Sequence, residues 1–231
     1  MIILTIDSAL DTFCAAVSED DRVLCETFCR RPRAQLRCLA RAVDDTLATA
    51  GVVKSDVNLV GVTKGPGSFT GIRLAETTAM TCAQILSAPV SAICTLDAVQ
   101  ASLPGSGCRT AVAFDARRGE IFSAVYLNGE RLTGYEALSP EGFVEFALNN
   151  GVESVTGNAL GRYGEMIRSG LPGATIYPDY FWYPHGNGMA ALSLDLFKKG
   201  EATPYSGVPQ FYMRLPEAEE ARERRLREGK A

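Results

Sequence analysis

Short apolar runs alternate along this chain with longer segments in which apolar residues recur every three or four positions. The run from Leu59 to Val62 is typical of a buried strand, and residues 70–86 carry an apolar stripe with the period of a helix. A similar stripe over residues 34–48 predicts a second helix. This alternation of strands and helices predicts an α/β fold in which mixed sheets are flanked by helices.

A glycine-rich turn, GPGSFTG at residues 65–71, separates the predicted strand from the helix that follows it. Glycine permits backbone angles that a side chain forbids, and Ser68 or Thr70 can cap the helix by accepting hydrogen bonds from its first amides. Such a helix start can bind an anion, but the P-loop pattern fails, because Ile72 follows Gly71 where a lysine is needed. The sequence leaves phosphate binding, a loose dinucleotide-binding motif and tight helix packing as alternatives.

Residues 3–24 align without a gap on residues 111–132, and each segment is typical of a β-hairpin. The alignment places Asp7 on Asp115, 108 positions later, at the end of the first strand of each copy. We interpret the repeat as an ancient duplication that gives two lobes of similar plan. The predicted boundaries are 1–106 for the first lobe, 107–204 for the second lobe, and 205–231 for a C-terminal segment that is helical and packs back toward the first lobe.

The composition narrows the range of functions. The formal net charge is −4 and the isoelectric point about 5.2, which disfavours a molecule that coats nucleic acid by itself. The seven cysteines are an odd number, and the close pair Cys25 and Cys29 has neither a second pair nor a nearby histidine. We therefore expect no zinc site and a reducing, cytoplasmic environment. We also expect no secretory leader before Asp7 and no membrane span.

His185 is the only histidine among the 231 residues. Zinc sites that need two histidines, and the paired-histidine helix of metalloproteases, are therefore excluded within this chain. A catalytic triad would have to recruit His185, which lies in an aromatic and glycine-rich loop without a Gly-x-Ser-x-Gly turn. We expect a packed or solvent-exposed loop histidine.

Aromatic residues cluster between Tyr177 and Tyr183 and could stack on bases, although interleaved cations are missing. For this cluster we favour packing in the core or between the lobes. The final segment, EAEEARERRLREGK, places acidic and basic residues four apart, which is typical of a solvated helix. A contact of this helix with nucleic acid or with a partner is the alternative.

The chain carries ILTIDSA at its first strand, GPGSFTGIR at the glycine turn, FDARRGE from Phe114, VTGNALGRY at 155–163 and PQFYMR near the end. These motifs resemble the TsaB (YeaZ) family, bacterial proteins needed to install threonylcarbamoyladenosine beside the anticodon of tRNAs. The likeness spans most of the chain and implies a two-lobed actin-like fold, which is a duplicated RNase H-like fold. Ala75 departs from the pattern, because the family usually has a further glycine there. His185 alone cannot supply the histidine pair with which the related TsaD proteins hold their metal.

In the actin-like plan, aspartates at two strand ends face a central cleft and handle nucleotide phosphates through a metal ion. Asp7 and Asp115 hold the equivalent positions, and their carboxylates suit magnesium. No glycine follows Asp7 directly, and Asp11 would repel phosphate. We therefore expect a vestigial cleft without a catalytic residue, a metal or a required cofactor, while weak binding of ATP, ADP or magnesium stays open. The expected cleft residues are Asp7, Ser8, Asp115, Arg117, Gly157 and Asn158.

The resemblance implies a non-catalytic scaffold and activator that pairs with a TsaD-type transferase through first-lobe helices, while a TsaE-type ATPase binds the pair. tRNA would be met through the complex, and the chain alone could form a homodimer through the same surface. The expected contact residues are Arg37, Arg41, Arg73, Leu74, Thr77, Ala79, Met80 and Ala83. A bulky charge at Ala79 is expected to abolish pairing and leave the fold intact. Two other classes stay open: a working actin-like ATPase or small-molecule kinase, and a nucleic-acid-binding module.

Overall fold

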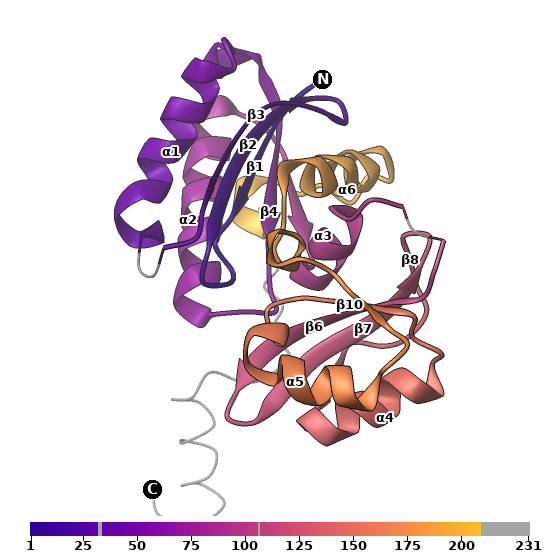
Figure 1. Ribbon diagram of the computed structural model, residues 1–231. Helices are drawn as coiled ribbons and strands as arrows, with labels where there is room; N and C mark the ends of the chain where they lie inside the picture. The colour runs from indigo at the N-terminus through magenta and orange to yellow at the C-terminus, as the bar shows by residue number, and fades with distance from the viewer. Residues whose placement is uncertain (32–33, 106, 209–231) are drawn as a thin grey trace, which may run out of the picture.

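The computed structural model describes residues 1–31, 34–105 and 107–208 of the protein and shows two lobes, each built on one β-sheet (Figure 1). The sheet of the first lobe has five strands in the order β3-β2-β1-β4-β5. Strands β1, β2 and β3 pair antiparallel, whereas β4 runs parallel to β1 and β5 parallel to β4. These strands are β1 (Ile2–Asp7), β2 (Phe13–Glu19), β3 (Arg22–Cys29), β4 (Val57–Thr63) and β5 (Val90–Ile93).

Helices cover both faces of the first sheet. α1 (Gln35–Thr49) and α2 (Phe69–Leu86) pack on one face, and α6 (Gly186–Lys198) lies beside α3 (Thr95–Ala101) on the opposite side (Figure 1). The two helices predicted from their apolar stripes, α1 and α2, begin and end within one residue of the expected bounds. Most of each stripe is buried in the core of the first lobe, although Leu36 at the start of the α1 stripe is 56% exposed. This burial stabilises helices that would be marginal in water on their own.

The second sheet repeats this plan with β6 and β7 in the places of β1 and β2. Its strand order is β11-β10-β6-β7-β8, and β9 also pairs with β7. The hairpin β6–β7 is antiparallel, whereas β10 runs parallel to both β6 and β11. α4 (Pro140–Asn149) and α5 (Leu160–Gly170) cover this sheet on the side away from the first lobe (Figure 1). The strands are β6 (Thr110–Arg117), β7 (Glu120–Leu127), β8 (Glu130–Arg131), β9 (Glu136–Leu138), β10 (Ser154–Thr156) and β11 (Thr175–Ile176).

The strand order confirms the predicted two-lobed actin-like architecture, because each sheet starts with an antiparallel hairpin and continues with parallel strands. The gapless alignment holds at the tight turns after β2 and β7, which coincide after a shift of 108 positions. The gapless alignment fails at the first turn of each lobe. Asp7 pairs with Cys14, but Asp115 pairs with Ile121, so the first-lobe loop is one residue longer. The two lobes therefore share their strand order, but the first lobe has one additional residue between its aspartate and the residue that pairs with it.

The last described segments return to the first lobe. α6 contacts all five strands of the first sheet, so the range 107–204 expected for the second lobe includes a helix that packs in the first. A short 3-10 helix, η3 (Tyr205–Gly207), lies against α2, and Val90 and Thr203 form an isolated bridge at the edge of β5. Most of the expected C-terminal segment, 209–231, lies outside the described residues. None of the described helices is both long enough and apolar enough to cross a membrane.

Candidate functional site

Asp7 ends β1 and is wholly buried. Its Oδ1 accepts hydrogen bonds from the hydroxyl of Thr63 at 2.5 Å and from the amide of Ala9 at 3.1 Å. Its Oδ2 is buried without a hydrogen-bond partner among the described residues. Burial disfavours the charged form and raises the pKa of Asp7 to about 6, although the Thr63 hydroxyl opposes this shift. The first-lobe carboxylate thus lies inside the protein, away from solvent.

The loop after β1 is held against the start of α2. Ser8 donates its hydroxyl hydrogen to the carbonyl of Gly71 at 2.7 Å, and the amide of Ser68 donates to the carbonyl of Ala9 at 2.6 Å. A Cβ added at Gly67 or Gly71 would overlap the carbonyl oxygens of Ala9 or Ser8. Ser68 also caps α2 by accepting a hydrogen bond from the amide of Gly71. The glycine turn therefore permits tight packing, and this favours the packing alternative over phosphate or dinucleotide binding.

Asp115 holds the equivalent place in the second lobe, and its side chain is 21% exposed. Its Oδ1 accepts a hydrogen bond from the amide of Arg117 at 2.8 Å, and its Oδ2 lies 3.6 Å from Nη1 of Arg162. The side-chain oxygen of Asn158 accepts a hydrogen bond from the backbone amide of Asp115 at 3.0 Å. Gly157 has a φ of +111°, and a Cβ there would overlap the backbone of β6. The structure brings these four expected residues together and adds Arg162, which lies in the motif VTGNALGRY but is not among the residues expected in the cleft.

The two carboxylates belong to separate groups. No described hydrogen bond or ion pair joins Asp7 or Ser8 to Asp115. Within the described ranges, no cluster of three or more His, Cys, Asp or Glu side chains could hold a metal ion. A metal-bound nucleotide fits these residues poorly, because Asp7 is fully buried and Asp115 already forms an ion pair with Arg162.

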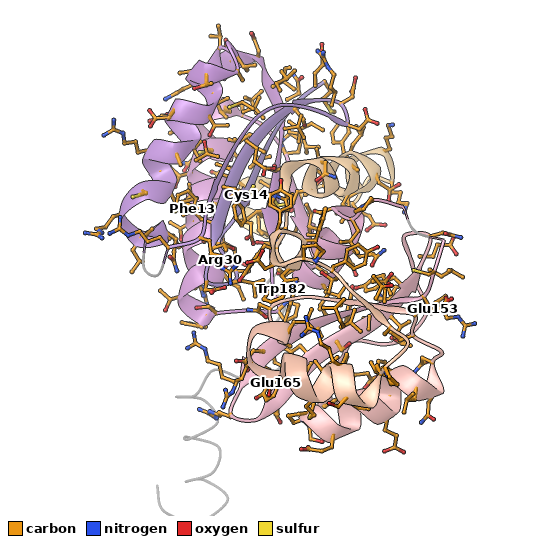
Figure 2. All side chains as sticks on the ribbon, in the orientation of Figure 1. Phe13, Cys14, Arg30, Glu153, Glu165 and Trp182 are labelled. Carbon is orange, nitrogen blue, oxygen red and sulfur yellow. The ribbon has the colours of Figure 1, made fainter. Side chains whose placement is uncertain are left out.

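The aromatic segment 177–183 packs at the junction of the lobes. The indole nitrogen of Trp182 donates a hydrogen bond to the carbonyl of Tyr177 at 2.9 Å. Arg30, which follows β3, pairs with Asp179 at 2.6 Å and lies 5.9 Å from the ring centroid of Trp182. Figure 2 shows Arg30 and Trp182 close together where the two lobes meet. The packing interpretation holds for Tyr183, which is buried, and for Trp182, which lies against Arg30, whereas Tyr180 is 55% exposed.

The residues expected to bind a partner divide into two sets. Ala79 and Ala83 are fully buried in the core of the first lobe, so they cannot lie on a contact surface. The expectation that a charge at Ala79 spares the fold is wrong, because the small face of α2 packs on the chain's own sheet. The other six residues are exposed or half-buried: Arg37, Arg41, Arg73, Leu74, Thr77 and Met80.

Exposed apolar side chains lie on the same two helices as these cations. Leu36 in α1 is 56% exposed, and Phe69 in α2 is 48% exposed. The guanidinium of Arg73 lies 5.3 Å from the ring centroid of Phe69. Exposed apolar groups beside arginine are typical of protein interfaces. We name the following residues the α1–α2 face: Leu36, Arg37, Arg41, Phe69, Arg73 and Thr77.

A model of the TsaD family, which is described as tRNA N6-adenosine threonylcarbamoyltransferase, matches residues 32–178, well over half of the chain. The chain belongs to this family. The match begins just before α1 and ends within the aromatic segment 177–183. It therefore includes the glycine turn and the second sheet.

Two curated relatives carry the TsaB name. The tRNA threonylcarbamoyladenosine biosynthesis protein TsaB of Bacillus subtilis is 33% identical over 128 residues, which are 54% of this chain and 55% of that protein. TsaB of Escherichia coli is 33% identical over 132 residues, which are 56% of this chain and 57% of that protein. The matched part thus spans little more than half the length of either relative.

A solved structure from Pseudomonas aeruginosa, described as similar to peptidase YeaZ, superposes with a TM-score of 0.77. It is 25% identical, and the match covers 92% of this chain and 99% of that one. Together with the curated relatives, this similarity confirms the resemblance to TsaB (YeaZ) proteins that the sequence motifs indicate.

Proposed function

We propose that this chain is a non-catalytic subunit in the synthesis of threonylcarbamoyladenosine beside the anticodon of tRNA, and that it acts by pairing with a TsaD-type transferase. The observation that carries the proposal is the environment of Asp7. Its carboxylate is fully buried and hydrogen-bonded to Thr63, in a chain whose family is described by a transferase activity. Because the aspartate at the end of β1 is fully buried, a supporting role fits this chain better than a catalytic one.

The surroundings of the two aspartates support the absence of nucleotide turnover. Phosphate binding in this fold would draw on free backbone amides and on carboxylates that share a metal ion. The amide of Ser68 is taken by the carbonyl of Ala9, and Asp115 faces Arg162. The chain therefore requires neither cofactor nor metal in this proposal, and any binding of ATP, ADP or magnesium is weak.

The α1–α2 face is the surface that we assign to the transferase. Leu36 and Phe69 offer apolar area, and the arginines beside them favour a partner that presents apolar and acidic groups. Without the transferase, the same face serves a second copy of the chain. A TsaE-type ATPase binds the pair in the cytoplasm. The tRNA is met through the complex, because a chain of net charge −4 has little attraction for phosphate on its own.

The test is gel filtration with light scattering on this chain mixed with the TsaD-type protein of the same genome. A one-to-one complex is expected. Leu36→Glu should weaken it at least about ten-fold, because a charge in an apolar contact must lose its water. Leu148→Glu is the matched control, since Leu148 is 59% exposed but lies on α4 of the second lobe. Equal weakening by both variants would exclude the α1–α2 face, and separate elution in every nucleotide state tried would contradict the pairing.

One observation favours a second candidate, an ATPase or a small-molecule kinase. Oδ2 of Asp7 is buried without a described hydrogen-bond partner, which is costly unless a cation or another group satisfies it. Metal-dependent ATP turnover by the purified chain, lost in Asp7→Asn, would support this candidate and contradict a non-catalytic subunit.

A further inference from the structure

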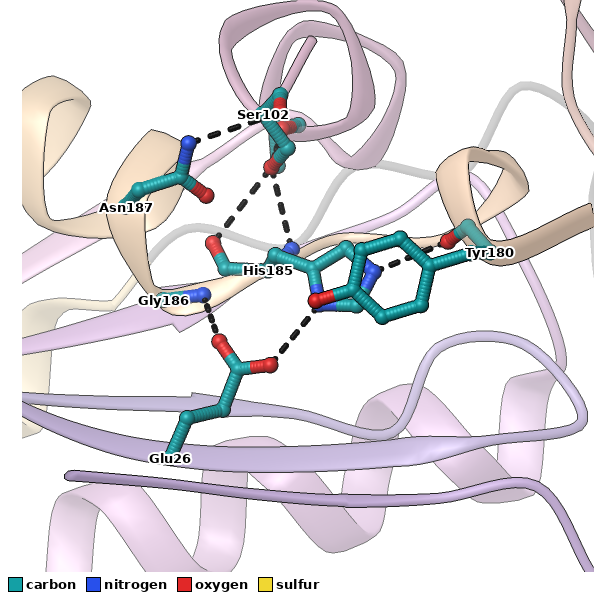
Figure 3. A network of polar contacts seen from close by, with 7 residues as sticks. Glu26, Ser102, Tyr180, His185, Gly186 and Asn187 are labelled. Atoms are coloured by element: carbon teal, nitrogen blue, oxygen red, sulfur yellow. Dashed lines mark hydrogen bonds and ion pairs between the residues drawn. The ribbon is translucent and has the colours of Figure 1, made fainter. Parts of the chain in front are cut away.

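His185 lies directly before α6 and is buried in a network that joins three parts of the chain (Figure 3). Its Nδ1 lies 2.8 Å from Oε1 of Glu26 on β3, and its Nε2 lies 2.9 Å from the carbonyl oxygen of Tyr180. The second oxygen of Glu26 accepts a hydrogen bond from the amide of Gly186, the first residue of α6, at 2.6 Å. One carboxylate thus holds both the histidine ring and the start of the helix.

The two acceptors around the ring fix its protonation state. A backbone carbonyl can only accept, so Nε2 must carry a hydrogen that it donates to Tyr180. A neutral ring would then turn the lone pair of Nδ1 toward the carboxylate of Glu26, where two acceptors would repel each other. Beside an ionised Glu26, whose pKa is lowered by the hydrogen bonds it accepts, both nitrogens are satisfied only when both carry hydrogen, which makes the ring a positively charged imidazolium.

We propose that His185 is a charged clasp: its imidazolium joins the first turn of α6 to β3, and removal of one ring proton releases that turn from the first sheet. The clasp matters for the fold because α6 covers the face of the first sheet opposite α1 and α2. It also explains why the ring is buried although it lies in a loop.

The network continues from the histidine backbone to the end of α3. The hydroxyl of Ser102 accepts a hydrogen bond from the amide of His185 at 3.0 Å and donates to the carbonyl of Ala98 at 2.6 Å. A Cβ at Gly188 would meet Ser102 at 2.5 Å, and a Cβ at Gly186 would meet β2 and Glu26. The close approach leaves no room for side chains at these two positions, so the first turn of α6 packs tightly against β2 and the end of α3.

The rings around His185 and the titratable groups that face it also favour the charged form. Tyr180 stacks on the imidazole at a centroid distance of 4.2 Å, and Phe28 lies at 4.8 Å, so aromatic faces lie against the positive ring. The titratable groups that act on it are Glu26 from β3 and Asp7 from β1, beside the ring of Tyr180, and Cys14 from β2 lies next to Glu26. Burial keeps the Cys14 thiol neutral by raising its pKa, so the charged neighbours are acidic.

The pH range of the clasp follows from its two partners. Burial opposes the charge on His185, but the hydrogen bond to Glu26 prevails and raises the pKa of the ring above the ordinary 6.5. Its contribution to stability is therefore complete below about 6.5 and is lost as pH rises through the raised value. The pKa of Glu26 is lowered despite burial, because it accepts from His185 and Gly186, so its contribution is lost only as pH falls through that lowered value. Between those two limits the clasp is closed.

The test is nitrogen-15 NMR of the imidazole in the full chain, where a single histidine makes the assignment unambiguous. At pH 6.5 both ring nitrogens should give imidazolium shifts, and the midpoint should lie above the ordinary value. Glu26→Gln should lower that midpoint. Glu19→Gln is the matched control, because it removes an exposed carboxylate from the same sheet and should leave the midpoint unchanged. A neutral tautomer at pH 6.5, or equal midpoints in Glu26→Gln and the wild type, would overturn the proposal.

Hydrogen exchange in the wild type tests the release of α6 without any variant. After correction for the pH dependence of exchange itself, the amides of residues 186–190 should exchange faster above the His185 titration than below it. The amides of α5 provide the internal control, because that helix packs in the second lobe and should keep its protection. Unchanged protection of 186–190 across the titration would contradict a clasp and leave His185 as a passive core residue.

Discussion

Asp7 and Asp115 occupy equivalent positions in the two lobes, yet the side chain of Asp7 is fully buried and that of Asp115 is partly exposed. In the first lobe, the loop after the aspartate packs on α2 through two glycines that leave room for it. In the second lobe, the turn after the aspartate is exposed, and Arg117 and Arg118 have positive φ values of 60° and 52°. The repeated strand order thus places a carboxylate, whereas the loop beyond the strand decides its environment.

The two environments have different energetic consequences. A carboxylate without solvent depends on the few hydrogen bonds that replace its water, and one oxygen of Asp7 has no such partner among the described residues. The carboxylate of Asp115 keeps part of its hydration, and the guanidinium of Arg162 beside it is 56% exposed, so this ion pair adds little stability. Stability should therefore depend strongly on the surroundings of Asp7 and weakly on those of Asp115.

Asp7→Asn should alter the dependence of stability on pH more than any other change at these sites. Because the pKa of Asp7 is raised from 3.8 to about 6, the folded protein keeps a proton that the unfolded chain has lost. The free energy of unfolding should therefore fall between about pH 4 and about pH 6, by up to about 3 kcal/mol from this group. Urea unfolding across this range measures the slope, and the variant should lose that part of it. Asp115→Asn is the control that should retain it; the same slope in both variants would refute the comparison.

Gly71→Ala tests whether the first-lobe loop depends on its tight approach to α2. The added Cβ would overlap the carbonyl of Ser8, and the required shift should cost about 2 to 3 kcal/mol in urea unfolding. Gly105→Ala is the control, because nothing lies within 4 Å of a Cβ there. Alanine is favoured over glycine inside a helix by about 1 kcal/mol, so a stabilised Gly71→Ala would show that the loop does not rest on the helix.

Thr63→Val removes the hydroxyl that donates to Asp7 and keeps the shape of the side chain. We expect a loss of about 1 to 2 kcal/mol at pH 8, since a buried carboxylate loses a donor, and a smaller loss at pH 4, where Asp7 carries its own proton. The same variant should raise the pKa of Asp7 further, because the Thr63 hydrogen bond lowers it. Thr77→Val, at an exposed position of α2, serves as the control. Equal losses at the two pH values would mean that the hydroxyl acts through packing alone.

Arg162→Met should have the smallest effect. The guanidinium is 56% exposed and lies 3.6 Å from Asp115, so we expect a change below about 1 kcal/mol in the free energy of unfolding. Thermal and urea unfolding at low and high salt would measure it. A loss above about 2 kcal/mol would show that Asp115 is as deeply engaged as Asp7, and the contrast between the lobes would fail.

Local patterns in the sequence were enough to locate much of the fold. Apolar stripes predicted α1 and α2 within one residue, and the residues around the glycine turn predicted a cap at Ser68 or Thr70, of which Ser68 is the one observed. The repeat of strand, turn and aspartate predicted the two lobes and the end of β1 at Asp7, but β6 continues past Asp115 to Arg117. These features follow from interactions among residues close in the chain, such as side-chain periodicity and capping, which a single sequence records.

Only the tertiary structure decided which of these residues meet solvent and which meet each other. Ala79 lies on a small-residue face that could have met a partner, and it is buried because the chain's own sheet covers that face. Glu26 and His185 are 159 positions apart and pair only because α6 returns to the first lobe. Burial is a sum over neighbours from distant parts of the chain. Periodicity therefore shows which residues share a face, but it does not show what covers that face.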